Sequence, residues 1–354
     1  MNLPVIPKSV LPEWIDRLCG DFRVVGPRRK RDEFVFSDIH SAAEVDLSYS
    51  TTILPPKKVF LPQNEELFAF EGNGHIMEAR PDNRPVLLLG LHACDMHAIV
   101  LLDRVFSQGF SDQHYDARRK KAVLVGLECL QPCSENAFCK DMGTLSVPEG
   151  FDLHLTDLGD AYSVDVGSEK GAELISDFEG VREAADKDTR RLDQVMSEKW
   201  PRFPYKLEEG ITEIPSLMTI GYRNSLWDDL GDKCLGCGSC TNVCPTCFCF
   251  DVHDEVDFSL SAGNRFRSWD SCQLNSFAVV AGGHDFRATR AARQRHRFSH
   301  KFKYIPDIYG TAGCVGCGRC AKTCVVHITP VETLNQLKKQ CAFPAGPEKE
   351  AVKS

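Results

Sequence analysis

The chain has 354 residues, enough for two domains that each bury a core of their own. Its 42 lysines and arginines against 50 aspartates and glutamates give a formal net charge of -8, which disfavours nucleic acid or an anionic membrane as the general partner. No stretch approaches 18 consecutive apolar residues, and the N-terminus lacks a basic segment followed by an apolar one. We therefore expect a soluble cytoplasmic protein without a membrane span.

The first part of the chain alternates between strand and helix patterns. Residues 86–91 are a short apolar run that predicts a buried strand, and a helix beginning near Asp95 follows with apolar residues at helical spacing. A second buried strand is predicted at 123–127. The order strand, helix, strand predicts a parallel pair joined by a right-handed crossover.

The pattern then changes to a hairpin and surface helices. Residues 151–167 alternate apolar and polar side chains across a Gly-Asp turn, which predicts a hairpin with one solvated face. Charged amphipathic segments at about 169–179 and 181–198 predict surface helices. Residues 199–215 carry three prolines and no strong periodicity, as is typical of an interdomain linker.

From Ser216 onwards the sequence predicts helices. One apolar face precedes Gly231 and consists of Leu217, Ile220, Trp227 and Leu230. The long segment between the two cysteine motifs also has a helical interpretation, and 329–341 predicts a last amphipathic helix. The predicted fold is an α/β N-terminal domain followed by a mainly α-helical ferredoxin-like dicluster domain. The expected division is 1–195 for the first domain, 196–215 for the linker, 216–345 for the second domain and 346–354 for a tail.

Two cysteine motifs of identical spacing are the strongest signal in the sequence. One begins at Cys234 and the other at Cys314, and each reads C-x2-C-x2-C-x3-C. In two-cluster ferredoxins the fourth cysteine of each motif binds the other cluster. The expected ligands are Cys234, Cys237, Cys240 and Cys324 for a first 4Fe-4S cluster, and Cys314, Cys317, Cys320 and Cys244 for a second.

Zinc is the main alternative ligand for these motifs. Structural zinc sites favour pairs of cysteines separated by a long gap, so zinc would leave one cysteine of each triplet unused. Clustering at gaps of two and three residues also favours metal over disulfides in a cytosolic chain. One departure from the ferredoxin pattern is Val325, which follows Cys324 where proline is usual.

Four N-terminal cysteines suggest a third site. Cys94 follows the strand predicted at 86–91, and two further cysteines follow the strand predicted at 123–127. Both strand ends should open on the same edge of a parallel sheet, where ligands collect in such folds. The candidate ligands of a third 4Fe-4S cluster are Cys94, Cys129, Cys133 and Cys139, and the alternative is a set of ordinary buried or free thiols.

Other cysteines have no assigned partner. If Pro245 opens a helix, Cys247 and Cys249 lie on different sides of it; they are either further ligands or buried thiols beside a cluster. Cys272 has the same two interpretations. Cys19 and Cys341 are most simply core or surface thiols.

A basic stretch precedes the second cysteine motif. Residues 286–303 are rich in Arg and Lys without acids, and they form either a solvated helix face or a set of cations that raises a cluster potential or attracts an acidic partner. The common nucleotide-binding motifs are missing from the sequence, since no G-x-G-x-x-G follows a strand and no G-x-x-x-x-G-K-[ST] occurs. The chain therefore gives no evidence of its own flavin or nicotinamide site.

Taken together, several segments resemble a known family. They are "KKVFLPQNEELFAF", "ACDMHAIVLLDRVF", "FDLHLTDLG", "CLGCGSCTNVCPTCFCFDV", "RSWDSC", "RFSHKFKY" and "GCVGCGRCAKTC". They resemble the dicluster beta subunit of soluble NAD(P)-linked nickel-iron hydrogenases and sulfhydrogenases, and the related iron-sulfur polypeptide of anaerobic sulfite reductase. Similar subunits accompany flavin oxidoreductases linked to heterodisulfide reductase. Relatives often read "TCFC" where this chain has Ala137 in "NAFC", which leaves Cys133 as the substitute.

The resemblance implies an electron-transfer subunit of anaerobic metabolism. Its clusters would relay single electrons between an FAD- and NAD(P)-binding subunit and a hydrogenase, sulfite reductase or heterodisulfide reductase module. The eight motif cysteines match the family's cluster ligands one by one. Two other interpretations stay open: a catalytic reductase subunit with its substrate at an N-terminal cluster, and an iron-sulfur redox sensor.

Overall fold

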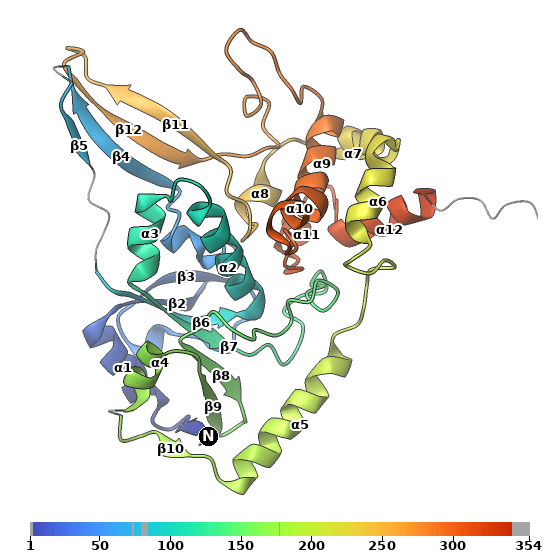
Figure 1. Cartoon of the computed structure of the whole chain (residues 1–354). Helices are drawn as coiled ribbons and strands as arrows, with labels where there is room; N and C mark the ends of the chain where they lie inside the picture. The colour runs from blue at the N-terminus through green and yellow to red at the C-terminus, as the bar shows by residue number, and fades with distance from the viewer. Residues whose placement is uncertain (1–2, 73, 79–83, 177, 342–354) are drawn as a thin grey trace, which may run out of the picture.

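The computed structural model describes residues 3–72, 74–78, 84–176 and 178–341, so the tail expected at 346–354 lies outside the described residues. A mixed eight-stranded sheet forms the centre of an α/β body, as the sequence predicted for the N-terminal part (Figure 1). In spatial order its strands are β10 (Arg182–Glu183), β1 (Pro4–Pro7), β9 (Ala161–Val166), β8 (Leu153–Asp157), β7 (Ala122–Leu127), β6 (Val86–His92), β2 (Arg23–Lys30) and β3 (Glu33–Ile39).

The middle of this sheet is parallel and its edges are antiparallel. Strands β2, β6, β7 and β8 run parallel to one another, whereas β3, β9, β1 and β10 pair antiparallel. Every residue of β6 and β7 is buried, which explains their continuous apolar sequence, because a central parallel strand is covered on both faces. The predicted parallel pair and the predicted β8–β9 hairpin are confirmed.

Helices cover both faces of the sheet. Figure 1 shows α2 (Ala93–Ser107) and α3 (Gln113–Lys120) on one face and α1 (Leu11–Asp21) and α4 (Glu169–Ser176) on the other. Trp14 joins the latter two helices by donating from Nε1 to the carbonyl of Leu174 at 3.1 Å. The long helix α5 (Asp186–Arg202) then leads the chain away from the sheet, so the helices predicted around 169–179 and 181–198 are confirmed in kind.

A second, four-stranded antiparallel sheet projects from the body in Figure 1. Its order is β11 (Phe250–Val256), β12 (Ala262–Trp269), β4 (Asn64–Glu71) and β5 (Ile76–Glu78). The helical interpretation of the segment after the first cysteine motif is therefore wrong. Strand β11 is exposed on both faces apart from one half-buried position, so no one-sided apolar alternation marks it as a strand in the sequence.

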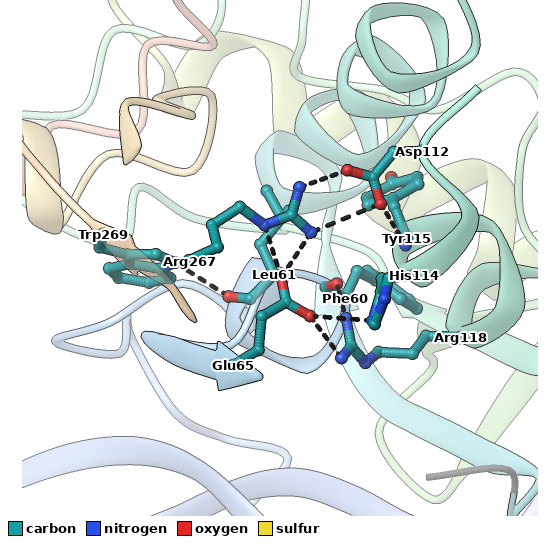
Figure 2. A network of polar contacts seen from close by, with 9 residues as sticks. All are labelled: Phe60, Leu61, Glu65, Asp112, His114, Tyr115, Arg118, Arg267 and Trp269. Atoms are coloured by element: carbon teal, nitrogen blue, oxygen red, sulfur yellow. Dashed lines mark hydrogen bonds and ion pairs between the residues drawn. The ribbon is translucent and has the colours of Figure 1, made fainter. Parts of the chain in front are cut away.

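A buried ion network fixes this second sheet to the body (Figure 2). Arg267 of β12 lies between two carboxylates: its Nε donates to Glu65 of β4 at 2.7 Å, and its Nη1 donates to Asp112 at the start of α3. Glu65 also accepts from Arg118 of α3 at 2.6 Å. Beside them, Trp269 donates from its indole to the carbonyl of Leu61 at 3.0 Å. Segments from both halves of the chain therefore share one buried polar cluster.

The remaining helices form a compact group around a second core, which includes Trp227, Phe298 and Leu334. Its longer helices are α6 (Ile214–Ile220), α7 (Leu226–Lys233), α9 (Arg290–Ser299) and α12 (Pro330–Cys341), with the π-helix η4 (His300–Tyr304) and α10 (Ile305–Tyr309) continuing α9. The short helices of the whole fold are α8 (Ser239–Asn242), α11 (Arg319–Lys322), η1 (Ala42–Glu44), η2 (Pro56–Val59) and η3 (Gly221–Arg223).

One detail of the predicted helix after Ser216 is wrong. The turn η3 interrupts it, and Ile220, expected on the apolar face, is exposed, whereas Leu217, Trp227 and Leu230 are buried as predicted. The division into 1–195 and 216–345 stays a prediction. Within the described ranges, no helix is both long and apolar enough to cross a membrane.

Candidate functional site

The two cysteine motifs adopt the same local conformation. Their glycines have matching positive φ angles, a region that favours glycine: 66° at Gly236, 76° at Gly238, 64° at Gly316 and 74° at Gly318. In both loops an amide points at the first sulfur, since Gly236 donates to Cys234 Sγ at 3.3 Å and Gly316 donates to Cys314 Sγ at 3.5 Å. The turn after Cys324 has the same assignment as the turn after Cys244, so Val325 does not alter the chain path.

Four cysteines from both motifs line one small cavity. Three come from the loop before and within α8, and the fourth comes from the end of the second motif: Cys234, Cys237, Cys240 and Cys324. Gln294 of α9 donates to Cys234 Sγ at 2.9 Å, and the amide of Ile328 donates to Cys324 Sγ at 3.3 Å. This set is the one expected to bind a first cluster, although its role as a ligand set stays a prediction.

The complementary four cysteines lie close together deeper in the molecule. Burial raises the pKa of Cys314 to about 12, and the charges of Cys320 and Cys244 contribute to this rise. Burial likewise raises the pKa of Cys317 well above its ordinary value, again with contributions from Cys244 and Cys320. The structure therefore brings Cys244 of the first motif to the three leading cysteines of the second.

Buried cations surround these thiols. Arg297 of α9 is buried, yet its pKa rises because the charges of the nearby thiols, Cys240 of the first set and Cys320 of the second foremost, outweigh the effect of burial. Lys301 in the π-helix is also buried with a raised pKa, and its Nζ donates to the Thr246 carbonyl at 2.9 Å. Buried charges need compensation, so anionic sulfur at these positions would be stabilised by these surroundings.

The N-terminal cysteines also converge. Burial raises the pKa of Cys129 well above its ordinary value and that of Cys139 to about 11, and in both cases the charge of Cys133 adds to the effect. The pKa of Cys94, raised mainly by burial, responds to Cys133 as well. The carboxyl ends of β6 and β7 thus bring together the four thiols that the sequence suggested for a third site.

This N-terminal set lies against the loop of the second motif. Cys94, Ala98, Val315 and Cys317 form one small buried cluster. The amide of Phe138 donates to the carbonyl of Gly316 at 2.7 Å. A Cβ at position 316 would lie 2.6 Å from the Phe138 backbone, so glycine is required there for close approach as well as for its φ angle.

A buried ion pair crosses the same contact. Both terminal nitrogens of Arg319, in α11, donate to the carboxylate of Asp95, in α2, at 2.7 Å, and both side chains are almost fully buried. Arg319 also donates from Nε to the carbonyl of Thr52 at 3.0 Å. Because Asp95 follows Cys94 and Arg319 precedes Cys320, the pair lies between the second set of thiols and the N-terminal set.

The unassigned thiols lie near these sets. No helix follows Pro245: the chain makes a turn and then extends into β11, which removes the premise that Cys247 and Cys249 lie on opposite sides of a helix. The side chain of Cys247 interacts with that of Cys244, and the side chain of Cys249 with that of Cys272. Whether they are ligands stays open.

Several residues of the site were missed in the sequence. Lys57, in η2, reaches across the fold and donates from Nζ to the carbonyl of Cys247 at 2.5 Å. Gln273 and Gln294, both buried, connect through Gln294 Nε2 to Gln273 Oε1 at 3.0 Å. Only the position of Gln273 directly after Cys272, and of Asp95 after Cys94, offered any signal, because distant segments supply the other contacts.

The donor set fits iron-sulfur clusters. Thiolates in two groups of four, with amides aimed at sulfur and cations nearby, are what such clusters require. A family model described as a 4Fe-4S dicluster domain matches residues 233–328. The chain is therefore an iron-sulfur protein of the dicluster class, and this class implies two 4Fe-4S clusters and an electron-transfer role.

A comparison with curated proteins narrows the class to a family. The chain is 37% identical to sulfhydrogenase 2 subunit beta of Pyrococcus furiosus over 341 residues, which cover 96% of this chain and 99% of that relative. It belongs to the family of hydrogenase beta subunits of which that relative is a member. No solved structure matches.

Proposed function

We propose that this chain is the electron-transfer subunit of a multi-subunit oxidoreductase in the cytoplasm. The observation that carries the proposal is the exchange of cysteines between the motifs: Cys324 of the second motif lines the cavity of the first, and Cys244 of the first lies with the second. This exchange is the arrangement of two-cluster ferredoxins. Each 4Fe-4S cluster, when bound, supplies one-electron chemistry, and the residues around it fix its position and its potential.

The N-terminal thiols extend the relay. We infer that Cys94, Cys129, Cys133 and Cys139 hold a third 4Fe-4S cluster. Two facts support it: the four thiols converge at the ends of β6 and β7, and they adjoin the second motif through Cys317 and the Gly316 loop. Three neighbouring sites would then run in the order first cavity, second set, N-terminal set.

The partners follow from the family. One is an FAD- and NAD(P)-binding flavoprotein, and the other is a terminal hydrogenase, sulfite reductase or heterodisulfide reductase module. The name of the relative, a sulfhydrogenase polypeptide, favours the hydrogenase module. This chain would pass single electrons between them and perform no bond chemistry itself.

The experiment is iron and acid-labile sulfide analysis of the anaerobically purified chain, with electron paramagnetic resonance after reduction by dithionite. Three clusters predict about twelve iron atoms per chain and two predict about eight. Stoichiometric zinc without a paramagnetic signal on reduction would contradict the electron-transfer role.

A single substitution tests the third cluster separately. We expect Cys94→Ser to lose about four iron atoms per chain and one paramagnetic signal. Cys19→Ser is the matched control, because Cys19 lies in α1, away from all three sets. Unchanged iron content in Cys94→Ser would rule out Cys94 as a required ligand, while leaving the two-cluster relay intact.

A further inference from the structure

The internal repeat allows one motif loop to be compared with the other. The two loops have the same backbone conformation, yet their surroundings differ. In the second loop the residue after the first cysteine, Val315, is 3% exposed, whereas its counterpart in the first loop, Leu235, is 59% exposed. The residue after the fourth cysteine differs too, since Pro245 is buried and Val325 is 73% exposed.

The α/β body is what covers the second loop. Val315 packs against Cys94 and Ala98 of α2, and its carbonyl accepts from Thr144 Oγ1 at 2.7 Å. Cβ atoms built on Gly316 or Gly318 would lie 2.6 Å from backbone atoms of residues 136–139, so the two segments are in direct contact. This face of the loop is therefore shaped for close apposition to another protein surface.

The first loop leaves the same face open. A Cβ on Gly236 would meet only Gln273, at 3.5 Å, and Arg293, at 3.9 Å. Leu235 and Val325 both line the mouth of the cavity that contains Cys237, which is itself exposed. An adjoining groove continues this surface with Leu274 beside Leu235. Two large apolar side chains exposed at a redox site mark an interaction surface rather than ordinary surface variation.

We propose that the face formed by Leu235, Val325 and the exposed Cys237 docks a second redox protein of the complex, which covers the first loop as the α/β body covers the second. The inference rests on the proposed function, because it assumes a cluster in the first cavity. The partner presents an apolar surface with a redox centre directly beneath it, since one-electron transfer needs close approach of the two centres. In the order of the three sites, this face is the outer end of the relay beside the first cavity.

The test uses the complex purified anaerobically through a tag on this chain, with its components identified by mass. In the double variant Leu235→Glu/Val325→Glu, we expect retention of the adjacent redox protein and the rate of electron exchange with it to fall at least tenfold. Iron content and reduction by dithionite should stay unchanged, because both side chains are exposed and neither is a ligand. Phe258→Glu, at the fully exposed tip of the β11–β12 hairpin, is the matched control.

A photo-crosslinking residue at position 235 should join the chain to a cofactor-containing partner, and one at position 258 should not. The inference is overturned if the double variant retains that partner and exchanges electrons with it as the control does. It is also overturned if position 235 links only to a second copy of this chain. Absence of iron from the wild-type chain would instead overturn the proposed function itself.

Discussion

Arg297 is the residue placed to affect both ferredoxin-type sites at once. It is buried in α9, and its charge interacts most strongly with Cys240 of the first set and Cys320 of the second. Neighbouring Arg290 is exposed on the same helix. The basic stretch is therefore not one uniform solvated face, because its side chains divide between solvent and the sulfur sites.

We predict that Arg297→Gln lowers the midpoint potentials of both clusters. A nearby positive charge stabilises the reduced, more negative state, so its loss should reduce the ratio of reduced to oxidised cluster about tenfold at fixed potential, which corresponds to about 59 mV for one electron. Potentiometric titration followed by electron paramagnetic resonance measures this shift. Arg290→Gln, with the same change of charge, should leave both potentials unchanged, and equal shifts in the two variants would contradict the assignment.

At the scale of elements, the β11–β12 hairpin depends on the network around Arg267. Its guanidinium is buried between Glu65 and Asp112, which belong to β4 and to the start of α3. Removing one partner of a buried ion pair leaves the other charges uncompensated. The hairpin is thus held to the body by charge as well as by its pairing with β4.

We predict that Arg267→Met loosens the hairpin. The expected cost is about 3 kcal/mol, which would raise the exchange rates of its backbone amides roughly a hundredfold. Hydrogen-deuterium exchange of β11 and β12 is the measurement. Arg265→Met, which breaks an exposed pair with Asp254 in the same strand pair, should have little effect. Unchanged exchange in Arg267→Met would mean that strand pairing alone holds the hairpin.

At the scale of the whole molecule, two ion pairs connect the second motif to the α/β body. Arg319–Asp95 is almost fully buried, and Lys322–Glu33 is largely exposed at 3.1 Å. They come from the same short helix, α11, and therefore offer a matched comparison of buried and exposed pairs. The body and the cysteine loops meet at this contact, so the pairs report on how the two parts stabilise one another.

We predict that Asp95→Asn destabilises the protein by about 3 kcal/mol or more, because it leaves the Arg319 charge buried without its partner. Iron should be lost first from the N-terminal set, whose Cys94 adjoins Asp95. Glu33→Gln should change stability by less than about 1 kcal/mol, since exposed pairs contribute little. Anaerobic thermal unfolding with iron analysis measures both. Similar behaviour of the two variants would show that burial of the Arg319 pair does not matter.

The sequence alone determined the chemistry of the cysteine loops and much of the α/β body. Thiol spacing and the intervening glycines are local, and a continuous apolar run such as β6 needs no distant partner to be recognised. The hairpin β11–β12 escaped prediction because its pairing partner, β4, lies far away in the sequence: Arg267 and Glu65 are 202 residues apart. Only the tertiary structure decided which loop the body covers and which it leaves open. Burial of Val315 and exposure of Leu235 depend on long-range packing, and equal local sequences carry no record of it.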